Sequence, residues 1–205
     1  ARESDLVDQA SGVSARVAIA GLELLASNLE RRALSQGETE VSARLCDLHM
    51  LLPAITGKVE MVYEGEQQGP EMVARQIIGQ AVKKVFGERF PEVGREVGSG
   101  GEDDTGPYAT MVQWFAAGNT ITLSDEQAFQ DFEAELARVP GLLELAEPFG
   151  PTREDRALGA EIILEGLHQH LKLAREDLDS QISYKELVKF HLLKPRGRRG
   201  DRDVN

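Results

Sequence analysis

Hydrophobic residues recur at helical spacing along most of this chain, and the pattern predicts a protein built almost entirely of α-helices. The clearest case is residues 15–36, a stretch rich in Ala, Leu, Glu and Arg. Its apolar positions lie close to the i, i+3, i+4, i+7 spacing of one helix face, and they are Val17, Ile19, Leu22, Leu25 and Leu29. Gly37 follows as a residue suited to end a helix. We therefore predict a helix over residues 15–36.

The same spacing predicts further helices downstream, at residues 41–52, 71–90, 107–117, 125–139, 152–171 and 183–192. Two of them begin with the pattern of a capping box, in which a Ser or Thr and the side chain three residues later bond to each other's backbone. Ser124 with Gln127 is one pair, and Thr152 with Asp155 is the other, although Asp replaces the usual Glu or Gln there. Ser183 is the predicted N-cap of the last helix.

Two stretches interrupt the helical pattern. Residues 64–70, rich in Gly, Glu and Gln, are predicted to form a loop. Residues 120–123, Thr-Ile-Thr-Leu, fit a short extended segment. The predicted fold class is therefore all-α, with one short extended segment near 120–123.

A glycine-rich stretch divides the predicted helices into two groups. Residues 92–106 contain Gly-Ser-Gly-Gly-Glu-Asp-Asp-Thr-Gly and read as a linker. These glycines do not form a phosphate-binding loop, because no Gly-Lys-Ser/Thr follows and no strand precedes them. We expect one helical domain at 1–91, a second at 107–193, and a basic disordered tail at 194–205.

The composition excludes several functional classes. A net charge of −12 over 205 residues argues against a general nucleic-acid binder, because polyanion binding rests on a basic surface. The only cysteine, Cys46, cannot form an internal disulfide, which fits a reducing compartment, and we expect a cytoplasmic protein. No apolar run is long enough to cross a membrane, and no signal peptide is visible. Because the chain begins without Met, we expect it to belong to a longer protein.

Side chains that could carry out catalysis or bind a metal are present, but their spacing favours structural roles. His168 and His170 are two residues apart, so on a helix their rings point apart and do not easily share a metal. The carboxylates at 102–104 lack the alternation and the final Glu of a calcium loop. Nothing marks Cys46 as a nucleophile. The aromatic residues at helical spacing are predicted core, and they are Trp114, Phe115, Phe129 and Phe132. We therefore identify no catalytic residue and no metal ligand.

One stretch does present a candidate binding site. Residues 11–14 form a polar loop before the first long helix, and Ser14 is a good N-cap. Arg16 follows in the first turn, where the helix dipole already supplies partial positive charge. First-turn amides together with an arginine make a site for a phosphate or a carboxylate. The residues leave a second interpretation open, in which Arg16 is a solvated arginine or pairs with a carboxylate among residues 3–8.

Several segments resemble one family of ATPases, and they are residues 11–20, 31–33, 48–53, 55–60, 71–75, 81–86 and 90–91. Together they closely resemble the C-terminal part of AAA+ ATPases of the magnesium-chelatase I-subunit type, a branch often grouped with MoxR-type ATPases. The resemblance covers residues 1–91 well. It extends more loosely into the second half, above all at residues 165–168.

This resemblance implies a fold and a role. Residues 1–91 would be the helical lid that follows an α/β nucleotide-binding core, and residues 107–193 a helical C-terminal extension. Ser14-Ala15-Arg16 resembles the sensor 2 element, in which the arginine reaches the γ-phosphate of ATP at a subunit interface. The implied nucleotide-binding residues are therefore Arg16 and Ser14. The implied cofactors of the parent protein are ATP and magnesium.

The resemblance also implies partners and an activity. The parent would be a hexamer-forming ATPase that uses ATP hydrolysis to remodel a partner or to help insert a metal. Its partners would be the AAA+ core, the neighbouring ATPase subunits and a protein with a metal-binding domain. If the displaced lid of chelatase-type ATPases is present here, Arg16 would serve the site of the neighbouring subunit.

The chain departs from this family in lacking the catalytic motifs. The Walker A and Walker B motifs, sensor 1 and the arginine finger would all precede residue 1. Gly57-Lys58 is no substitute, because no glycine-rich run comes before it. We therefore expect that this chain alone neither binds ATP tightly nor hydrolyses it.

Two other functions stay open on the sequence. The first is a stand-alone helical interaction module whose acidic surface docks a basic partner. The second and weaker one is contact with nucleic acid through the basic residues 194–202.

Overall fold

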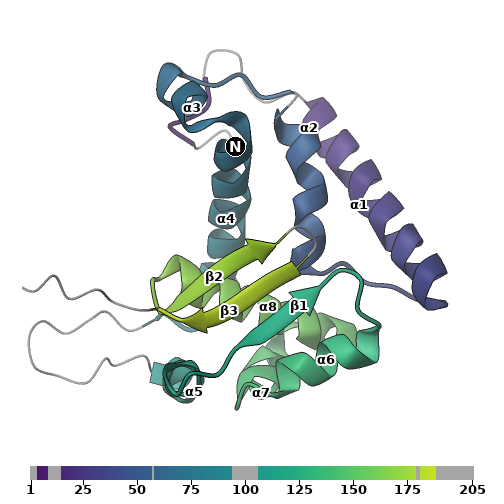
Figure 1. The fold of residues 1–205 in the computed structure, drawn as a ribbon, viewed down its shortest axis with the longest axis vertical. Helices are drawn as coiled ribbons and strands as arrows, with labels where there is room; N and C mark the ends of the chain where they lie inside the picture. The colour runs from purple at the N-terminus through teal and green to yellow at the C-terminus, as the bar shows by residue number, and fades with distance from the viewer. Residues whose placement is uncertain (1–3, 9–14, 57, 94–105, 179–180, 188–205) are drawn as a thin grey trace, which may run out of the picture.

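The computed structural model describes residues 4–8, 15–56, 58–93, 106–178 and 181–187. These residues form eight α-helices, short 3₁₀ helices (η) and a three-stranded antiparallel sheet (Figure 1). The α-helices are α1 (Ala15–Gln36), α2 (Leu52–Thr56), α3 (Tyr63–Gln68), α4 (Pro70–Arg89), α5 (Ala109–Ala116), α6 (Phe129–Ala137), α7 (Leu142–Ala146) and α8 (Arg153–Gln169). The 3₁₀ helices are η1 (Leu45–Leu51), η2 (Gly106–Tyr108) and η3 (Glu147–Phe149). The strands are β1 (Ile121–Ser124), β2 (Leu173–Leu178) and β3 (Gln181–Glu186).

The long helices largely confirm the sequence-based prediction. Helix α1 has the predicted bounds, and Gly37 after it has a φ of 67°, a left-handed conformation that favours glycine. The predicted capping box at the start of α8 is also confirmed. The backbone N–H of Asp155 donates to Thr152 Oγ1 at 3.0 Å, and the Thr152 N–H donates to Asp155 Oδ2 at 3.1 Å. These features depend on neighbouring residues only, so the sequence was sufficient to predict them.

The sheet corrects the all-α prediction. Strand β1 confirms the extended segment expected near 120–123, but β2 and β3 were not predicted. The expected N-cap Ser183 lies in β3 opposite Thr122, so the helix predicted to begin there is wrong over residues 183–186. Beyond residue 187 that prediction lies outside the described residues. Strand β3 lies between β1 and β2 and pairs antiparallel with both, and its alternate residues Ile182 and Tyr184 are buried.

Three predictions about element boundaries were also wrong. The stretch expected to be a loop at 64–70 forms most of helix α3. Residues 41–52 were expected to be one α-helix, but residues 41–44 are not helical and Leu45–Leu51 form the 3₁₀ helix η1. Helix α2 then begins at Leu52, with Pro53 in its first turn, where the missing N–H is tolerated. Ser124 does not cap a helix, because it ends β1, and α6 begins only at Phe129.

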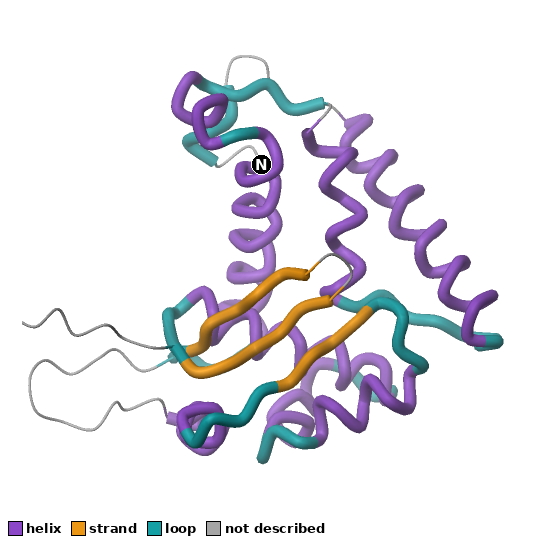
Figure 2. The backbone as a smooth tube through the Cα atoms, in the orientation of Figure 1, coloured by secondary structure: helices purple, strands orange, loops and turns teal. Residues whose placement is uncertain are grey.

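A hydrophobic core joins the two halves of the chain, and a second, smaller cluster lies within the first half. In Figures 1 and 2, α4 descends from the first half towards α8 and the sheet of the second half, and it packs against α8. The core joins residues from α4 to residues from α5, α6, α8 and the sheet; among its large members are Phe86, Phe90, Tyr108, Phe115, Phe132, Leu136, Ile163 and Tyr184. Gly166 of α8 permits this packing, because a Cβ there would overlap the Phe86 ring.

The division into domains at 92–106 stays a prediction, and residues 94–105 and the predicted tail at 194–205 lie outside the described residues. Within the described part of the chain, no helix combines the length and the apolar character of a membrane span.

Candidate functional site

The exposed start of helix α1 carries the arginine that the sequence singled out. Arg16 lies in the first turn of α1, and its side chain is exposed. That turn contains no acidic residue. The exposed helix end therefore combines a guanidinium group with the positive end of the dipole of a 22-residue helix. Ser14, the other predicted nucleotide-binding residue, lies outside the described residues.

Two apolar side chains near Arg16 face solvent, whereas Val17 packs against the hydrophobic cluster of the first half. Ile19 is 59% exposed and Leu22 is 69% exposed. The side chains that α1 buries completely are those of Asn28 and Arg32. Helix α1 therefore joins the rest of the protein through polar contacts as well as through Val17, and it presents Ile19 and Leu22 outward beside its arginine.

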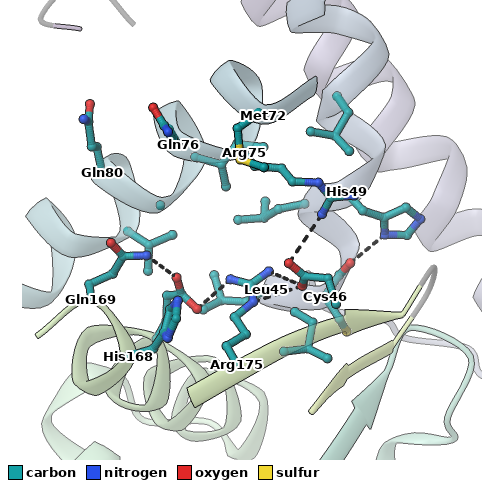
Figure 3. A pocket seen from close by; sticks show the side chains of 18 residues that line it. Leu45, Cys46, His49, Met72, Arg75, Gln76, Gln80, His168, Gln169 and Arg175 are labelled. Carbon is teal, nitrogen blue, oxygen red and sulfur yellow. Dashed lines mark hydrogen bonds and ion pairs between the residues drawn. The ribbon is translucent and has the colours of Figure 1, made fainter. Parts of the chain in front are cut away.

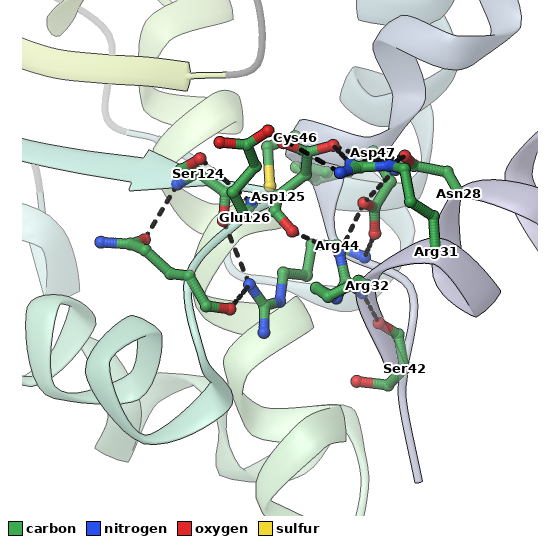
Figure 4. Close-up of polar contacts among 12 residues, drawn as sticks. Asn28, Arg31, Arg32, Ser42, Arg44, Cys46, Asp47, Ser124, Asp125 and Glu126 are labelled. Atoms are coloured by element: carbon green, nitrogen blue, oxygen red, sulfur yellow. Dashed lines mark hydrogen bonds and ion pairs between the residues drawn. The ribbon is translucent and has the colours of Figure 1, made fainter. Parts of the chain in front are cut away.

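A buried ion pair attaches the second half of α1 to the segment that follows it (Figure 4). Arg32 Nη1 lies 2.6 Å from Asp47 Oδ1, and both side chains are almost fully buried. Arg32 Nη2 donates to the Ser42 carbonyl at 2.6 Å, and Nη1 also donates to the Asp125 carbonyl at 3.2 Å. The guanidinium therefore joins three segments: α1, the stretch around η1 and the loop after β1.

Asn28 and Arg31 extend this network. The Asn28 amide donates to Asp47 Oδ1 at 2.8 Å and to Asp125 Oδ2 at 3.1 Å. Arg31 Nη2 donates to the same Asp125 oxygen at 2.9 Å and to Asn28 Oδ1 at 2.9 Å. Because Asp125 follows β1, these bonds connect α1 directly to the second half of the chain. We call Asn28, Arg31, Arg32, Asp47 and Asp125 the α1 anchor.

Arg44 makes a second connection beside the α1 anchor. Its Nη1 donates to the carbonyls of Ser124 at 3.1 Å and Gln127 at 2.8 Å, and its guanidinium lies 4.2 Å from the centre of the Phe132 ring. Burial lowers the pKa of Arg44, and the nearby charge of Arg32 lowers it further. Its two carbonyl partners lie in the second half of the chain, so Arg44 also fixes the first half against β1 and the loop after it.

Glu161 is a buried carboxyl group on α8 that contacts the start of η1. Its Oε2 accepts from the Leu45 N–H at 2.9 Å, and its Oε1 accepts from the Cys46 N–H at 3.4 Å. Burial raises the pKa of Glu161 to about 8, although the two backbone donors favour the charged form. Near neutral pH this group is therefore largely protonated in the folded protein.

A pocket of about 390 Å³ lies between the two halves, formed by η1, α4, α8, β2 and β3 (Figure 3). Its walls are apolar and polar in similar measure. The apolar residues are Leu45, Cys46, Leu48, Leu52, Met72, Ile78, Val82 and Ile182, and the polar and charged residues include His49, Arg75, Gln76, Gln80, Glu165, His168, Gln169, Arg175 and Asp177. This volume lies within the range of about 300–1,000 Å³ typical of small-molecule sites.

Ion pairs line the floor of this pocket. Arg175 Nη1 donates to buried Glu165 at 2.6 Å, and its Nε and Nη2 both donate to Asp177 Oδ1, at 3.0 and 2.6 Å. Burial alone would lower the pKa of Arg175, but its neighbours, Glu165 and Asp177 among them, outweigh burial and raise it above the ordinary value. Arg175 is therefore a fixed cation in the pocket.

His168, His170 and Cys46 lie beside backbone carbonyls or in the core. The Nδ1 atoms of His168 and His170 lie 3.1 and 2.8 Å from the carbonyls of Leu173 and Gly166. Among the described residues, no group of three or more His, Cys, Asp or Glu side chains could hold a metal ion. Cys46 is buried, and burial raises the pKa of its thiol, which makes it a poor nucleophile.

The sequence analysis missed the α1 anchor and the buried acids of α8. Asn28 and Arg32 lie one helical turn apart, and so do Glu161 and Glu165, each pair among apolar residues. Polar residues repeated at i, i+4 on a face that also contains apolar residues can indicate a buried polar contact. That signal was available, but the partners Asp47 and Asp125 are distant in sequence, and nothing local identifies them.

Comparison of the chain with protein-family models, with curated proteins and with solved structures finds no match.

Proposed function

We propose that this chain is the lid and C-terminal portion of a magnesium-chelatase-like AAA+ ATPase. In this proposal Arg16 senses the γ-phosphate of ATP, and the chain couples ATP hydrolysis to remodelling of a partner or to metal insertion. The observation that carries it is the arrangement of α1, which holds Arg16 in an exposed first turn and is bound by the α1 anchor further along. The resemblance of residues 11–20 to the sensor 2 element supports the same assignment.

The chemistry of Arg16 suits this role. A guanidinium near the γ-phosphate stabilises the charge that develops during phosphoryl transfer. The first-turn amides of α1 and its dipole favour the same anion. When the γ-phosphate leaves, its contact with Arg16 is lost, and the position of the start of α1 reports the state of the nucleotide.

The contacts of helix α1 allow a movement at its start to reach other parts of the chain. At 1.5 Å per residue, its 22 residues span about 33 Å. The α1 anchor ties the helix to η1 and to the loop after β1, so a rotation of α1 moves both segments. The exposed apolar residues Ile19 and Leu22 supply a surface on which a nucleotide-binding core can pack beside the arginine.

The test is ATP hydrolysis by this chain joined to an intact ATPase core of the family. The chain is expected to restore activity, and Arg16→Ala is expected to lower kcat by about a hundredfold or more, the scale of removing one transition-state donor. Arg138→Ala is the matched control, because Arg138 is also exposed and pairs with Glu135, three residues before it. Full ATPase activity of the Arg16→Ala variant would refute the sensor role.

A second function is favoured by the net charge of −12 and by the apolar residues exposed on α1. In this alternative the chain is an acidic helical module that binds a basic partner without catalysis. The intact mass of the native protein distinguishes the two. A product of about twice the 22.5 kDa of this chain supports the ATPase, and a product of 22.5 kDa supports the module.

A further inference from the structure

The pocket between α4, η1, α8 and the β2–β3 hairpin contains an arrangement that neither proposed function uses. Two arginines from different elements, Arg75 of α4 and Arg175 of β2, approach it from opposite walls (Figure 3). Between them lies the carboxylate of Asp177. It accepts two bonds from Arg175, and its other oxygen lies 3.5 Å from Arg75 Nη1. The pocket therefore already holds one carboxylate on a pair of guanidinium groups.

The charged side chains of the pocket differ in how well their hydrogen bonds are satisfied. Buried Glu165 accepts from Arg175, Gln169 and Tyr184, so its oxygens are well satisfied. Arg75, in contrast, directs Nε and Nη2 to Glu71, a carboxylate whose side chain is 67% exposed.

This difference favours an anion over a cation as the pocket's ligand. A surface pair such as Arg75–Glu71 holds its partner weakly, because solvent screens it. The contact of Arg75 with Asp177 is also long. The guanidinium of Arg75 can therefore bind a further anion at a small cost in free energy. The carboxylates in the pocket already accept hydrogen bonds, so they bind a cation less readily.

The other residues that line the pocket indicate the chemistry of the rest of the ligand. Five apolar side chains are among the residues that line the pocket, and they are Leu48, Leu52, Met72, Ile78 and Val82. Apolar walls with a few fixed polar groups are typical of sites for small organic molecules. The parallel N–H donors of an arginine match the two oxygens of a carboxylate. Arg175 already directs two of its donors to a carboxylate here, both to Asp177 Oδ1.

We propose that this pocket binds a small amphipathic organic acid, with its carboxylate on Arg75 and Arg175 and its apolar body against Leu48, Leu52 and Met72. In the unliganded protein Asp177 occupies part of the anion site and competes with the ligand. The proposal rests on the pocket alone and does not require that the chain belong to an ATPase.

The test is binding of octanoate to the purified chain, followed by isothermal titration calorimetry. Octanol and octylamine serve as probes of the same apolar length without the negative charge. Octanoate is expected to bind at one site and at least tenfold more tightly than either. Equal affinity for octanoate and octanol, or tighter binding of octylamine, overturns the proposal.

Substitutions in the pocket test whether octanoate binds there. Arg75→Ala is expected to weaken octanoate binding about tenfold, the scale of one charge-assisted hydrogen bond. Arg89→Ala, an exposed arginine on the same helix outside the pocket, is expected to change it less than twofold. Asp177→Asn removes the competing charge, and we expect octanoate to bind several-fold more tightly to it. Equal effects of the two arginine variants, or no saturable binding to Asp177→Asn, refute the assignment.

Discussion

Replacing Glu161 with glutamine tests whether a buried, protonated carboxyl group makes stability depend on pH. Glu161 is 1% exposed, and its pKa in the folded protein is about 8, raised chiefly by burial. In the unfolded chain the pKa returns to about 4.5. Between these two values the folded state holds a proton that the unfolded state has released. Stability therefore falls as pH rises through this window.

The size of the effect follows from the two pKa values. Each pH unit within the window changes the free energy of unfolding by about 1.4 kcal/mol. Between pH 5 and pH 8 this gives a loss of about 3 to 4 kcal/mol, because the slope levels off close to the folded-state pKa. The total stability of a domain is about 5–15 kcal/mol, so the loss is easily measured.

Glutamine has the shape of a protonated glutamate and cannot ionise. Glu161→Gln keeps an oxygen that can accept from the Leu45 N–H, and it removes the desolvation penalty that ionisation incurs at high pH. We therefore expect the variant to gain about 3 to 4 kcal/mol relative to the wild type between pH 5 and pH 8. The wild type should approach the stability of the variant towards the acid end of this range.

The assay is urea unfolding followed by circular dichroism at pH 5, 6, 7 and 8. Glu144→Gln is the control, because it removes one exposed negative charge from a chain of net charge −12 without touching the core. The control should follow the wild type at every pH. A difference between Glu161→Gln and the wild type that is constant with pH, or that changes in the opposite direction, would refute the reasoning.

Two further substitutions test the packing that positions the candidate sites. Arg32→Met is expected to destabilise the protein by about 3–5 kcal/mol in urea unfolding, because it leaves Asp47 as a buried carboxylate without its cation. Adding Asp47→Asn should recover at least half of that loss, and no recovery would mean that the ion pair is not the cause. Gly166→Ala is expected to destabilise the protein by at least about 2 kcal/mol, because its Cβ would overlap the Phe86 ring. Gly87→Ala, in open space on α4, should be neutral or slightly stabilising, and equal thermal shifts of the two alanine variants would contradict this.

Local signals account for the parts of the fold that the sequence predicted. Helix α1 was predicted with its correct bounds, because apolar spacing and the glycine at 37 both act within a few residues. Strands β2 and β3 were missed for the opposite reason. Residues 173–178 contain Arg, Glu and Asp and lack a clear alternation of apolar and polar residues, so the β2–β3 hairpin has no clear local signal. Strand β3 also pairs with β1, a partner far away in the sequence.

The residues of the candidate sites also fall into those that the sequence predicted and those that it did not. Arg16 was found because its position in a helix turn is a local property. The pairing of Arg32 with Asp47, and of Arg75 with Asp177, arises only when separate elements pack together. Sequence patterns without homologues cannot establish such pairs, even when each residue is conspicuous alone.

The central place of β3 in the sheet has a consequence for synthesis on the ribosome. Ile121 of β1 pairs with Tyr184 of β3, and every described partner of β1 in the sheet is on β3. Translation proceeds at about 5–20 residues per second. Several seconds therefore pass between the synthesis of β1 and the synthesis of its partner strand. During that time β1, whose residues Ile121 and Leu123 are buried in the folded protein, has no strand with which its backbone can pair. The nascent chain should therefore be most prone to aggregation, and most in need of a chaperone, while residues 125–180 are being translated.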